Sequence, residues 1–563
     1  MWTTNGVATF ALLSLGCGCA ASDQFACPSL PPAGVGPSSE RYNTKPVVDG
    51  GFKFIGGIKT AFEGPFDDVK SPIFDESTGE RAIIGRLPRM GEHDALEAVQ
   101  AAAAAWDEGQ GEWPKMSMAK RIQAIEAFVS KLSDVRDDIV EVLMWEIAKN
   151  SQDAAKEFDR TMEFIRSAIS EIKADPTIRQ GFGFAEWSEV SGVSVRVRRG
   201  PVGVMLGLAP FNYPLNEMYA MLIPALLMGN VAVLKLPAIG GLSHVLTAEA
   251  FGSVLPPGVI NFVSGSGRTT MGPIMRSGLV DVLGFIGGTK GADALIKEHP
   301  KPHRLKVFSQ LEGKNLGIVL PDADLDVAAA QCTLGATAYN GQRCTAIKLI
   351  MVHDSIADEF VKKLIARISA LKVGLPWEHG VAITPLPEPN KPKYLEELMR
   401  DAISKGATLA NADNGGGSVA GALMTPAVID RVSSAMRLFH EEQFGPVVPI
   451  ARYANLSEVQ AAIKASWNGQ QASIFTSKAQ AAGPLIDTLS TVVGRINLNT
   501  QCGRSPDVVP FSGRRSSAMG TMSVTEALRV FSIETVVAYP AKDETSESVA
   551  HELDSYTSFL APL

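Results

Sequence analysis

The chain has 563 residues, 45% hydrophobic and 20% charged, which exceeds what one hydrophobic core organises and predicts two or three domains of globular composition. A formal net charge of −8 leaves no basic excess for phosphate backbones and argues against general nucleic-acid binding. Three of the six cysteines fall in the first 30 residues, which excludes a disulfide framework elsewhere, and no spacing typical of a metal site occurs.

Residues 1–45 do not follow the pattern of a folded domain. Val7–Ala20 is a short apolar run without a preceding Lys or Arg, and a stretch rich in Pro, Gly and Ser follows it. A secretory signal begins with basic residues, and a membrane span needs roughly 20 apolar residues. We expect a disordered or processed leader and a cytoplasmic folded body that binds no membrane. A signal or organelle-targeting role for the leader stays open.

The next part of the chain alternates strand and helix patterns. We expect a strand and turn at 71–80 and helices at 94–106, 117–137, 138–149 and 153–173. The last of these carries Arg160 and Arg166 near its middle. In 187–199, valine alternates with serine and arginine, and this period of two predicts an exposed ribbon of strands.

A βαβ rhythm follows. Short apolar runs at 202–208, 231–234, 259–263 and 282–286 are candidate buried parallel strands, with helical patterns at 216–228, 243–254, 269–277 and 291–298. This order predicts an α/β fold with a doubly wound sheet that binds ligands at the carboxyl ends of its strands. A second α/β region begins at 316–320 and carries Cys344. No internal repeat is present, and the last twenty residues have the composition of a polar tail.

The segment 339–346 has the residue types of a nucleophilic site. Arg343 precedes Cys344, and Gly341 permits a sharp turn of the backbone. A thiolate is a strong nucleophile, and a nearby cation or backbone N–H lowers the pKa of a thiol. The alternative is a small buried cysteine in a core segment.

Four segments resemble, in order and spacing, the signatures of the aldehyde dehydrogenase superfamily. They are Ala-Pro-Phe-Asn-Tyr-Pro at 209–214, Val-Leu-Lys at 233–235, Gly-Gln-Arg-Cys at 341–344 and Glu-Gln-Phe-Gly-Pro at 442–446. The resemblance covers roughly residues 45–540. Within the superfamily the chain is most similar to the NADP-dependent, non-phosphorylating glyceraldehyde-3-phosphate dehydrogenases, through 164–166, 211–213 and 497–513.

The resemblance implies a three-part architecture. It comprises a Rossmann-type NADP-binding domain at 46–177 and 200–311, a β-ribbon oligomerisation arm at 178–199 and 525–541, and an α/β catalytic domain at 312–524, with a tail at 542–563. An arm of this kind leaves an edge strand for another subunit to pair with. We therefore expect a homotetramer or homodimer.

The resemblance also implies which residues carry the reaction. Cys344 would add to an aldehyde, and the amide of Asn212 with the Cys344 backbone N–H would stabilise the oxyanion, each such donor being worth about 3–4 kcal/mol in other enzymes. Alternatively, Asn212 is a polar loop residue. The expected product of this step is a thioester, formed as hydride passes to a nicotinamide cofactor.

Cofactor contacts are expected from five residues. By resemblance, Lys235 would meet the adenosine ribose or its phosphate, and Glu442 with Phe444 would lie at the nicotinamide ribose; outside the family, Lys235 and Glu442 would be ordinary surface charges. Gly267 and Gly288 precede or open helices and suit the close approach of a diphosphate, although short glycine pairs are also common in turns. NAD-preferring relatives often carry an acid at the position of Ala238. Its absence favours NADP over NAD, and no metal is expected.

Cations point to a phosphorylated substrate. Arg166, Arg343 and Arg504 fall where the resemblance places substrate-binding arginines, with Tyr213 at the tyrosine position. Arginine forks match phosphate oxygens in bidentate fashion. The expected substrate is D-glyceraldehyde 3-phosphate, oxidised to 3-phosphoglycerate. Any one of the arginines could instead form a structural ion pair.

One departure from the family pattern affects hydrolysis. Gln310 occupies the position of the usual general-base glutamate, and a glutamine cannot accept a proton at neutral pH. Glu312 lies two residues later, about 6–7 Å along an extended chain, on the same face of a strand. We favour Glu312 as the base for thioester hydrolysis. The alternatives are transfer to coenzyme A, another semialdehyde dehydrogenase, or an inactive structural member of the fold.

Overall fold

The computed structural model describes residues 45–75, 77–174, 185–561 and 563. The predicted leader therefore lies outside the described residues, apart from residue 45. None of the helices in these ranges combines the length and apolarity that crossing a membrane requires.

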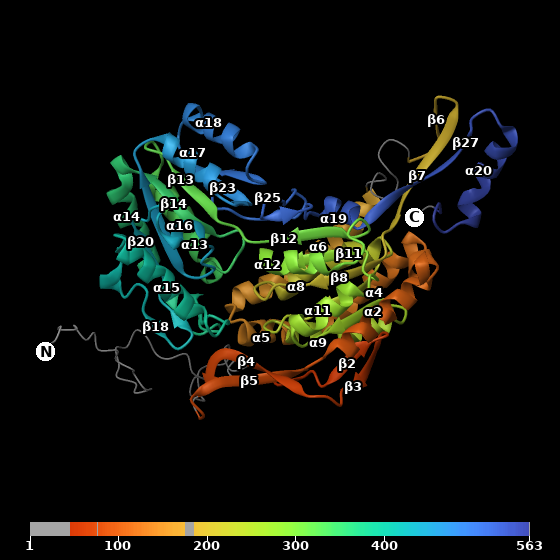
Figure 1. Ribbon diagram of the computed structural model, residues 1–563, viewed down its shortest axis with the longest axis horizontal. Helices are drawn as coiled ribbons and strands as arrows, with labels where there is room; N and C mark the ends of the chain where they lie inside the picture. The colour runs from red at the N-terminus through yellow and green to blue at the C-terminus, as the bar shows by residue number, and fades with distance from the viewer. Residues whose placement is uncertain (1–44, 76, 175–184, 562) are drawn as a thin grey trace, which may run out of the picture.

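The N-terminal part consists of two small sheets followed by helices (Figure 1). One sheet has the order β1 (Val48–Asp49), β5 (Glu80–Pro88), β4 (Phe66–Asp75), and the hairpin pairs β2 (Phe52–Ile55) with β3 (Ile58–Ala61). The helices are α2 (Glu92–Trp106), α3 (Glu112–Lys115), α4 (Met118–Asp134), α5 (Arg136–Glu146) and α6 (Ser151–Ala174), with a short 3₁₀ turn η1 (Asp107–Gly109). Their buried faces belong to the largest hydrophobic core of the molecule.

The predicted doubly wound sheet is confirmed. Five parallel strands run in the order β10 (Ile260–Val263), β9 (Val231–Lys235), β8 (Val204–Leu208), β11 (Val282–Ile286), β12 (Lys306–Gln310), and β26 (Ala518–Met519) adds an antiparallel edge. The covering helices are α8 (Pro214–Leu227), α9 (Leu242–Val245), α10 (Ala248–Val254), α11 (Gly267–Arg276) and α12 (Thr289–Glu298). Because the strand order reverses between β8 and β11, a crevice opens at their carboxyl ends.

A second body, at the left in Figure 1, is built on a seven-stranded sheet. Its order is β17 (Thr408–Leu409), β20 (Ala427–Asp430), β21 (Val447–Tyr453), β14 (Ile347–His353), β13 (Asn315–Val319), β23 (Gln471–Phe475), β24 (Arg495–Leu498), parallel except for β17. Its helices are α13 (Leu325–Thr337), α14 (Asp354–Ser369), α15 (Lys391–Ser404), α16 (Arg437–His440), α17 (Leu456–Ala465) and α18 (Ala479–Ser490), with 3₁₀ turns η2 (Ala338–Gly341) and η3 (Ala412–Asn414). Short pairs join β15 (Lys372–Val373) to β16 (Val381–Ile383), β18 (Val419–Ala420) to β19 (Leu423–Met424), and β22 (Asn468–Gly469) to β25 (Arg514–Arg515).

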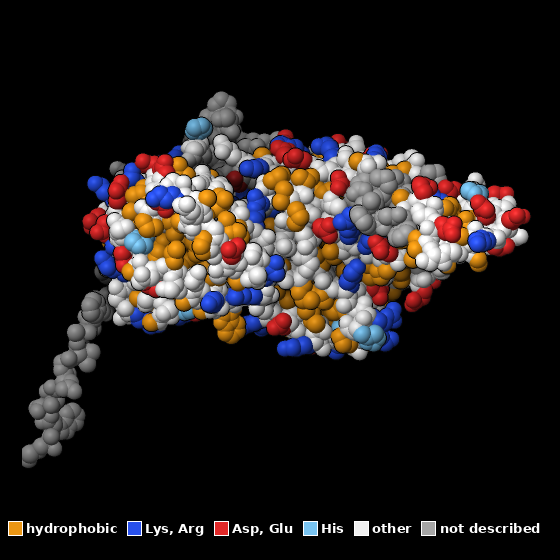
Figure 2. Space-filling view, turned by 90° about the horizontal axis from the view of Figure 1, so that it is seen from above, with side chains coloured by type: hydrophobic (Ala, Val, Ile, Leu, Met, Phe, Trp, Pro, Cys, Tyr) orange, Lys and Arg blue, Asp and Glu red, His pale blue; other side chains and the backbone are white. Residues whose placement is uncertain are grey.

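An arm extends from the other end of the molecule (Figure 1). It has the order β27 (Ser532–Pro540), β7 (Val193–Pro201), β6 (Ser188–Val190), and α19 (Val524–Val530) leads into it. The predicted polar tail contains a helix, α20 (Glu544–Tyr556), which packs back on the arm through an ion pair between Asp554 and Arg196. Leu560, which follows this helix, is also buried. The space-filling view shows acidic side chains gathered at this end (Figure 2).

Candidate active site

A cavity of about 1140 Å³ lies where loops of the two sheets meet. On one side it is lined by residues that end or follow strands of the six-stranded sheet, namely Asn212 after β8, Gly288 after β11 and Gln310 at the end of β12. On the other side it is lined by residues that precede strands of the seven-stranded sheet, including Cys344 before β14 and Glu442 before β21. The predicted nucleophile thus faces the crevice at the sheet's switch point.

A tight turn presents Cys344 to the cavity. Tyr339, Asn340 and Gly341 all adopt the left-handed conformation, with φ of 48°, 56° and 71°. The side chain of Asn340 holds the turn by exchanging two hydrogen bonds with Thr384, at 2.9 and 3.0 Å. A non-glycine residue in this region is strained and persists only where its surroundings fix it, as they do here.

The surroundings of the Cys344 thiol raise its pKa on balance. Its enclosure in the protein raises its pKa above the ordinary value, and the nearby charge of Glu217 adds to the effect, whereas the Lys348 ammonium opposes it. The guanidinium of Arg343 instead turns toward backbone carbonyls, donating to Gly335 at 3.1 Å. The expectation that the neighbouring cation lowers the thiol pKa is therefore not met.

Asn212 lies beside the cysteine loop. Its Nδ2 donates a 2.8 Å hydrogen bond to the carbonyl of Gln342, two residues before Cys344. The Cys344 carbonyl accepts hydrogen bonds from Asn315, at 2.7 Å, and from Lys348, at 3.2 Å. An amide N–H₂ has a second hydrogen to offer, so Asn212 can remain bonded to the loop and still donate to an oxyanion on the substrate.

Gln310 and Glu312 have different surroundings. Gln310 is only 2% exposed, lines the cavity, and finds no hydrogen-bond partner for its amide among the described residues. The Glu312 carboxylate accepts a hydrogen bond from the hydroxyl of Thr289, the first residue of α12. The strand assumed to continue through Glu312 ends at Gln310, so the argument that both side chains share one strand face was wrong.

Glu442 forms an ion pair with Lys348, which also donates to the carbonyl of Cys344. Its carboxylate lies 2.6 Å from the Lys348 ammonium and accepts a 3.1 Å hydrogen bond from the N–H of Gly313. Phe444 adopts φ of 47° and meets Phe211 edge to face, with the ring centroids 5.8 Å apart. Both Glu442 and Phe444 line the cavity. The resemblance predicts that these two residues contact the nicotinamide ribose.

Of the other predicted cofactor residues, Gly288 lines the cavity, whereas Lys235 and Gly267 lie outside the lining. Lys235 ends β9 and is buried, which lowers its pKa to about 8. Its ammonium donates to the carbonyl of Leu236 and to no carboxylate among the described residues. Gly267 is the exposed first residue of α11. Both residues lie at carboxyl-end positions of adjacent parallel strands, β9 and β10.

Two of the three predicted arginines line the cavity. Arg504 donates to Glu217 at 2.7 Å and approaches Asp507 at 3.1 Å, and Arg343 lines the same wall. Arg166 is exposed on α6 and is absent from the lining, so the structure does not place it with the other two arginines. Arg160 lines the cavity instead, since six residues along a helix turn a side chain about 120° away.

Several site residues had no assigned role in the sequence analysis. Arg160 binds Asp507 in bidentate fashion, at 2.6 and 2.9 Å. Lys149 pairs with Glu157, both fully buried, and its ammonium lies 3.3 Å from the centroid of the Tyr213 ring. The signal for Arg160 was the helical period of α6, whereas no sequence pattern identifies a buried Lys–Glu pair eight residues apart.

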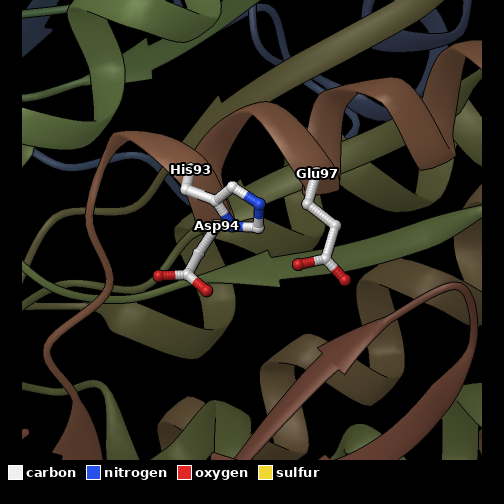
Figure 3. A group of neighbouring side chains, drawn as sticks. All are labelled: His93, Asp94 and Glu97. Atoms are coloured by element: carbon white, nitrogen blue, oxygen red, sulfur yellow. The ribbon is translucent and has the colours of Figure 1, made fainter. Parts of the chain in front are cut away.

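Among the described residues, one group of side chains has the spacing of metal ligands. Figure 3 shows His93, Asp94 and Glu97 on the first turns of α2. The ammonium of Lys53 lies 2.6 Å from Glu97 and 3.6 Å from Asp94, which also accepts a hydrogen bond from the Gly91 N–H. These carboxylates already have a cation, and the group does not line the cavity.

Comparisons with known proteins agree on one family. The model of the aldehyde dehydrogenase family matches residues 68–537. An NADP-dependent glyceraldehyde-3-phosphate dehydrogenase of Streptococcus equinus is 36% identical over 454 residues, 80% of this chain and 92% of the relative. A protein of the same description from Arabidopsis thaliana is 32% identical over 428 residues, 75% of this chain and 83% of the relative. The crystal structure of such an enzyme from Bacillus halodurans complexed with NADP superposes with a TM-score of 0.79 at 31% identity, covering 87% of this chain and 99% of that one.

Proposed function

The chain belongs to the aldehyde dehydrogenase family, and we propose that it oxidises D-glyceraldehyde 3-phosphate to 3-phosphoglycerate with NADP+ and water. The observation that carries the proposal is the cavity, whose lining combines a cysteine, an oxyanion donor and arginines. The relatives at 36% and 32% identity are NADP-dependent glyceraldehyde-3-phosphate dehydrogenases, which supports the same reaction.

In the proposed mechanism, the Cys344 thiolate attacks the aldehyde carbon and forms a thiohemiacetal. The Nδ2 of Asn212 and the backbone N–H of Cys344 stabilise the negative oxygen. Bound NADP+ would accept the hydride, and collapse of the thiohemiacetal leaves an acyl thioester on Cys344. Water, relieved of a proton by a base, then releases 3-phosphoglycerate and returns the thiol.

The residues present fit NADP+. Gly288 caps α12, and a Cβ on it would come 3.0 Å from a carboxylate oxygen of Glu312, so the helix N-terminus already accommodates an anion. Lys235 would contact the 2′-phosphate of the adenosine ribose, and Ala238 leaves no carboxylate there to repel that phosphate. Gly267 would allow the diphosphate of the cofactor to approach the backbone. Glu442 and Phe444 would receive the nicotinamide ribose.

The substrate phosphate is proposed to lie against Arg343, Arg504 and the hydroxyl of Tyr213. The Nε of Arg504 lies 3.1 Å from Asp507, whereas its Nη2 and the Nε of Arg343 have no hydrogen-bond partner among the described residues. Buried unpaired guanidinium N–H groups are costly, and a phosphate would satisfy them. We also assign Arg160 to this phosphate site in place of Arg166, because Arg160 lines the cavity and Arg166 does not.

For the hydrolytic step we propose Glu312 as the base, with Gln310 orienting the water. Glu312 is the carboxylate nearest in sequence to the family's base position, and its side chain lines the cavity. The unpartnered amide of Gln310 offers both a donor and an acceptor to a water molecule. Transfer of the acyl group to coenzyme A remains the second candidate, because no carboxylate occupies position 310 itself.

The testing experiment follows NADPH formation by purified enzyme given glyceraldehyde 3-phosphate and NADP+, without phosphate or coenzyme A. We expect steady turnover, its loss in Cys344→Ser, and a burst followed by slow turnover in Glu312→Gln. Adding Gln310→Glu to Glu312→Gln should restore part of the steady rate. Cys332→Ala, a buried cysteine away from the cavity, is the matched control and should retain activity.

Two outcomes would contradict the proposal. Equal activity on an uncharged aldehyde such as propionaldehyde would argue against the phosphorylated substrate. A wild-type burst that stalls and resumes only on addition of coenzyme A would favour the acylating alternative, and NADP+ binding without any turnover would favour an inactive member of the fold.

We also propose that the chain assembles as a homodimer or homotetramer through its arm and acts in the cytoplasm. Within the described residues, β27 pairs with β7 on one side and with no strand on the other. Its domains would be those of the family, with the cofactor domain at 46–177 and 200–311, the arm at 178–199 and 525–541, and the catalytic domain at 312–524.

A further inference from the structure

The Glu312 side chain occupies a position built for an anion. It lies at the N-terminus of α12, a helix of ten residues, where the N–H of Gly291 bonds the carbonyl of Gly288 at 3.0 Å and the partial positive charge of the helix end favours an anion. Its Oε2 accepts the hydroxyl hydrogen of Thr289, and its Oε1 lies over Gly288. In the described part of the chain, no Lys or Arg pairs with this carboxylate, and the Thr289 hydroxyl is its hydrogen-bond donor.

Hydrogen bonds fix the backbone around Glu312, whereas its side chain is bonded only through the carboxylate. The N–H of Leu311 bonds the carbonyl of Ser517 at 2.8 Å, and the Ser517 hydroxyl bonds the carbonyl of Glu312 at 2.7 Å. The N–H of Gly313 bonds Glu442 at 3.1 Å. Rotation of the Glu312 side chain therefore moves the carboxylate without moving the loop.

A second observation points to a ligand at this place. Gln310, 2% exposed and lining the same cavity, has neither its Nε2 nor its Oε1 bonded to any described residue. Buried amides are almost always paired, so an unpaired one that faces a cavity indicates a partner from outside the chain. The cavity wall near α12 thus has an anion position, at Glu312, and an amide without a hydrogen-bond partner, at Gln310, two residues apart in the sequence.

We propose that Glu312 is an internal competitor for the cofactor, whose diphosphate must displace the carboxylate from the N-terminus of α12. This inference rests on the proposed use of NADP+. A helix end cannot hold a carboxylate and a diphosphate at once without strong repulsion between them. The displaced carboxylate would turn away from α12 within the cavity that Cys344 also lines, so the base would become available only once the cofactor is in place.

The test measures NADP+ affinity directly, by calorimetry or by quenching of tryptophan fluorescence, with no aldehyde present. A carboxylate at a helix N-terminus is stabilised enough that its removal should tighten NADP+ binding about two- to tenfold in Glu312→Gln and Glu312→Ala. Inorganic diphosphate, as a competitor, should become more effective by a similar factor. Adenosine 2′-monophosphate, which lacks the diphosphate, should bind wild type and variants alike.

The matched control is Glu298→Gln, which removes the same charge from the exposed C-terminal end of α12 and should leave NADP+ affinity unchanged. Unchanged or weaker NADP+ binding in both Glu312 variants would overturn the competition, even if the wild type oxidises glyceraldehyde 3-phosphate steadily. Tighter binding in these variants would support it, even if the wild type shows no aldehyde oxidation and the proposed function fails.

Discussion

Cys344 is held at the cavity, and its surroundings raise the pKa of its thiol above the ordinary value. The left-handed turn at Tyr339, Asn340 and Gly341 brings it to the cavity, while burial and the charge of Glu217 raise its pKa. A neutral thiol resists oxidation and premature alkylation. We therefore expect the thiol to lose its proton only when a bound ligand changes the charges around it and lowers its pKa.

The first prediction concerns the pH dependence of this thiol. Because the pKa of Cys344 is raised, its thiolate is the minor form at neutral pH and grows about tenfold per pH unit below the pKa. The rate of alkylation by iodoacetamide, followed by mass spectrometry on the Cys344 peptide, should rise steadily from pH 7 to 9. Glu217→Gln should raise the rate at fixed pH by removing a nearby negative charge.

The control for that measurement is Cys332, which is buried and should stay unmodified across the same range. A rate for Cys344 that is already maximal at pH 7 would show a thiolate at neutral pH and contradict the raised pKa. A slower rate in Glu217→Gln would show that the Glu217–Arg504 pair acts on the thiol through Arg504.

At single positions, sequence reasoning succeeded where a motif was contiguous. Asn212, Tyr213, Arg343, Cys344 and Glu442 all line one cavity, as their signatures predicted. It did not tell Arg160, which lines the cavity, from Arg166, which does not, because two arginines on one helix differ only in the face they occupy. It also missed that the strand ends at Gln310, two residues before Glu312, because no residue type marks that end.

Among the elements, the β8–α8 connection carries the oxyanion donor, and a buried ion pair supports it. Glu157 on α6 accepts the N–H groups of Leu215 and Asn216, at 3.1 and 3.3 Å, at the start of α8. Lys149 neutralises this carboxylate and packs against the face of Tyr213. The pair thus fixes the segment that immediately follows Asn212.

The second prediction tests this support by a double-mutant cycle. Lys149→Met or Glu157→Gln alone leaves one buried group without its partner and should cost about 3–5 kcal/mol of unfolding free energy. Both changes together should cost less than the sum of the two, because no unpaired charge remains. Urea unfolding, followed by circular dichroism, measures the three differences.

An additive result would contradict the coupling and show that each residue acts through other contacts. The exposed pair of Lys173 and Glu126 is the matched control, with single changes expected to cost at most about 1 kcal/mol. A large loss there would indicate that α6 and α4 depend on surface charges more than their buried contacts suggest.

The regular elements were largely predictable because their residues are locally consistent. The apolar runs of β8 to β11 are buried on both faces, which is the pattern of parallel strands between helices. The two-residue strand β26 was not predicted, because its pairing with β12 depends on a contact across more than 200 residues of chain. The helix α20 was missed for its charged composition, although Asp554 and Leu560 tie it to the molecule.

At the scale of the whole molecule, the arm presents an edge that one chain leaves uncovered. Along β27, Ile533 is 51% and Val536 58% exposed, and among the described residues no strand lies on that side. Long exposed edges with apolar side chains are ready to pair with another chain. The helix α20 packs against the arm, and acidic side chains gather at this end of the molecule (Figure 2). We therefore expect a second copy to approach the free edge of β27 and not the acidic surface of α20.

The last prediction is that β27 mediates self-association. Val536→Lys places a charge in the middle of the exposed edge and should shift the protein from a dimer or tetramer toward monomers at micromolar concentration, as measured by analytical ultracentrifugation. Val549→Lys on α20, at a site of similar exposure, should leave the assembly unchanged. A monomeric wild type, or an unchanged assembly in Val536→Lys combined with Ile533→Lys, would contradict a role for the edge. If β27 does pair with a second copy, NADP+ binding should survive in the monomeric variant, because the cavity is built from one chain alone.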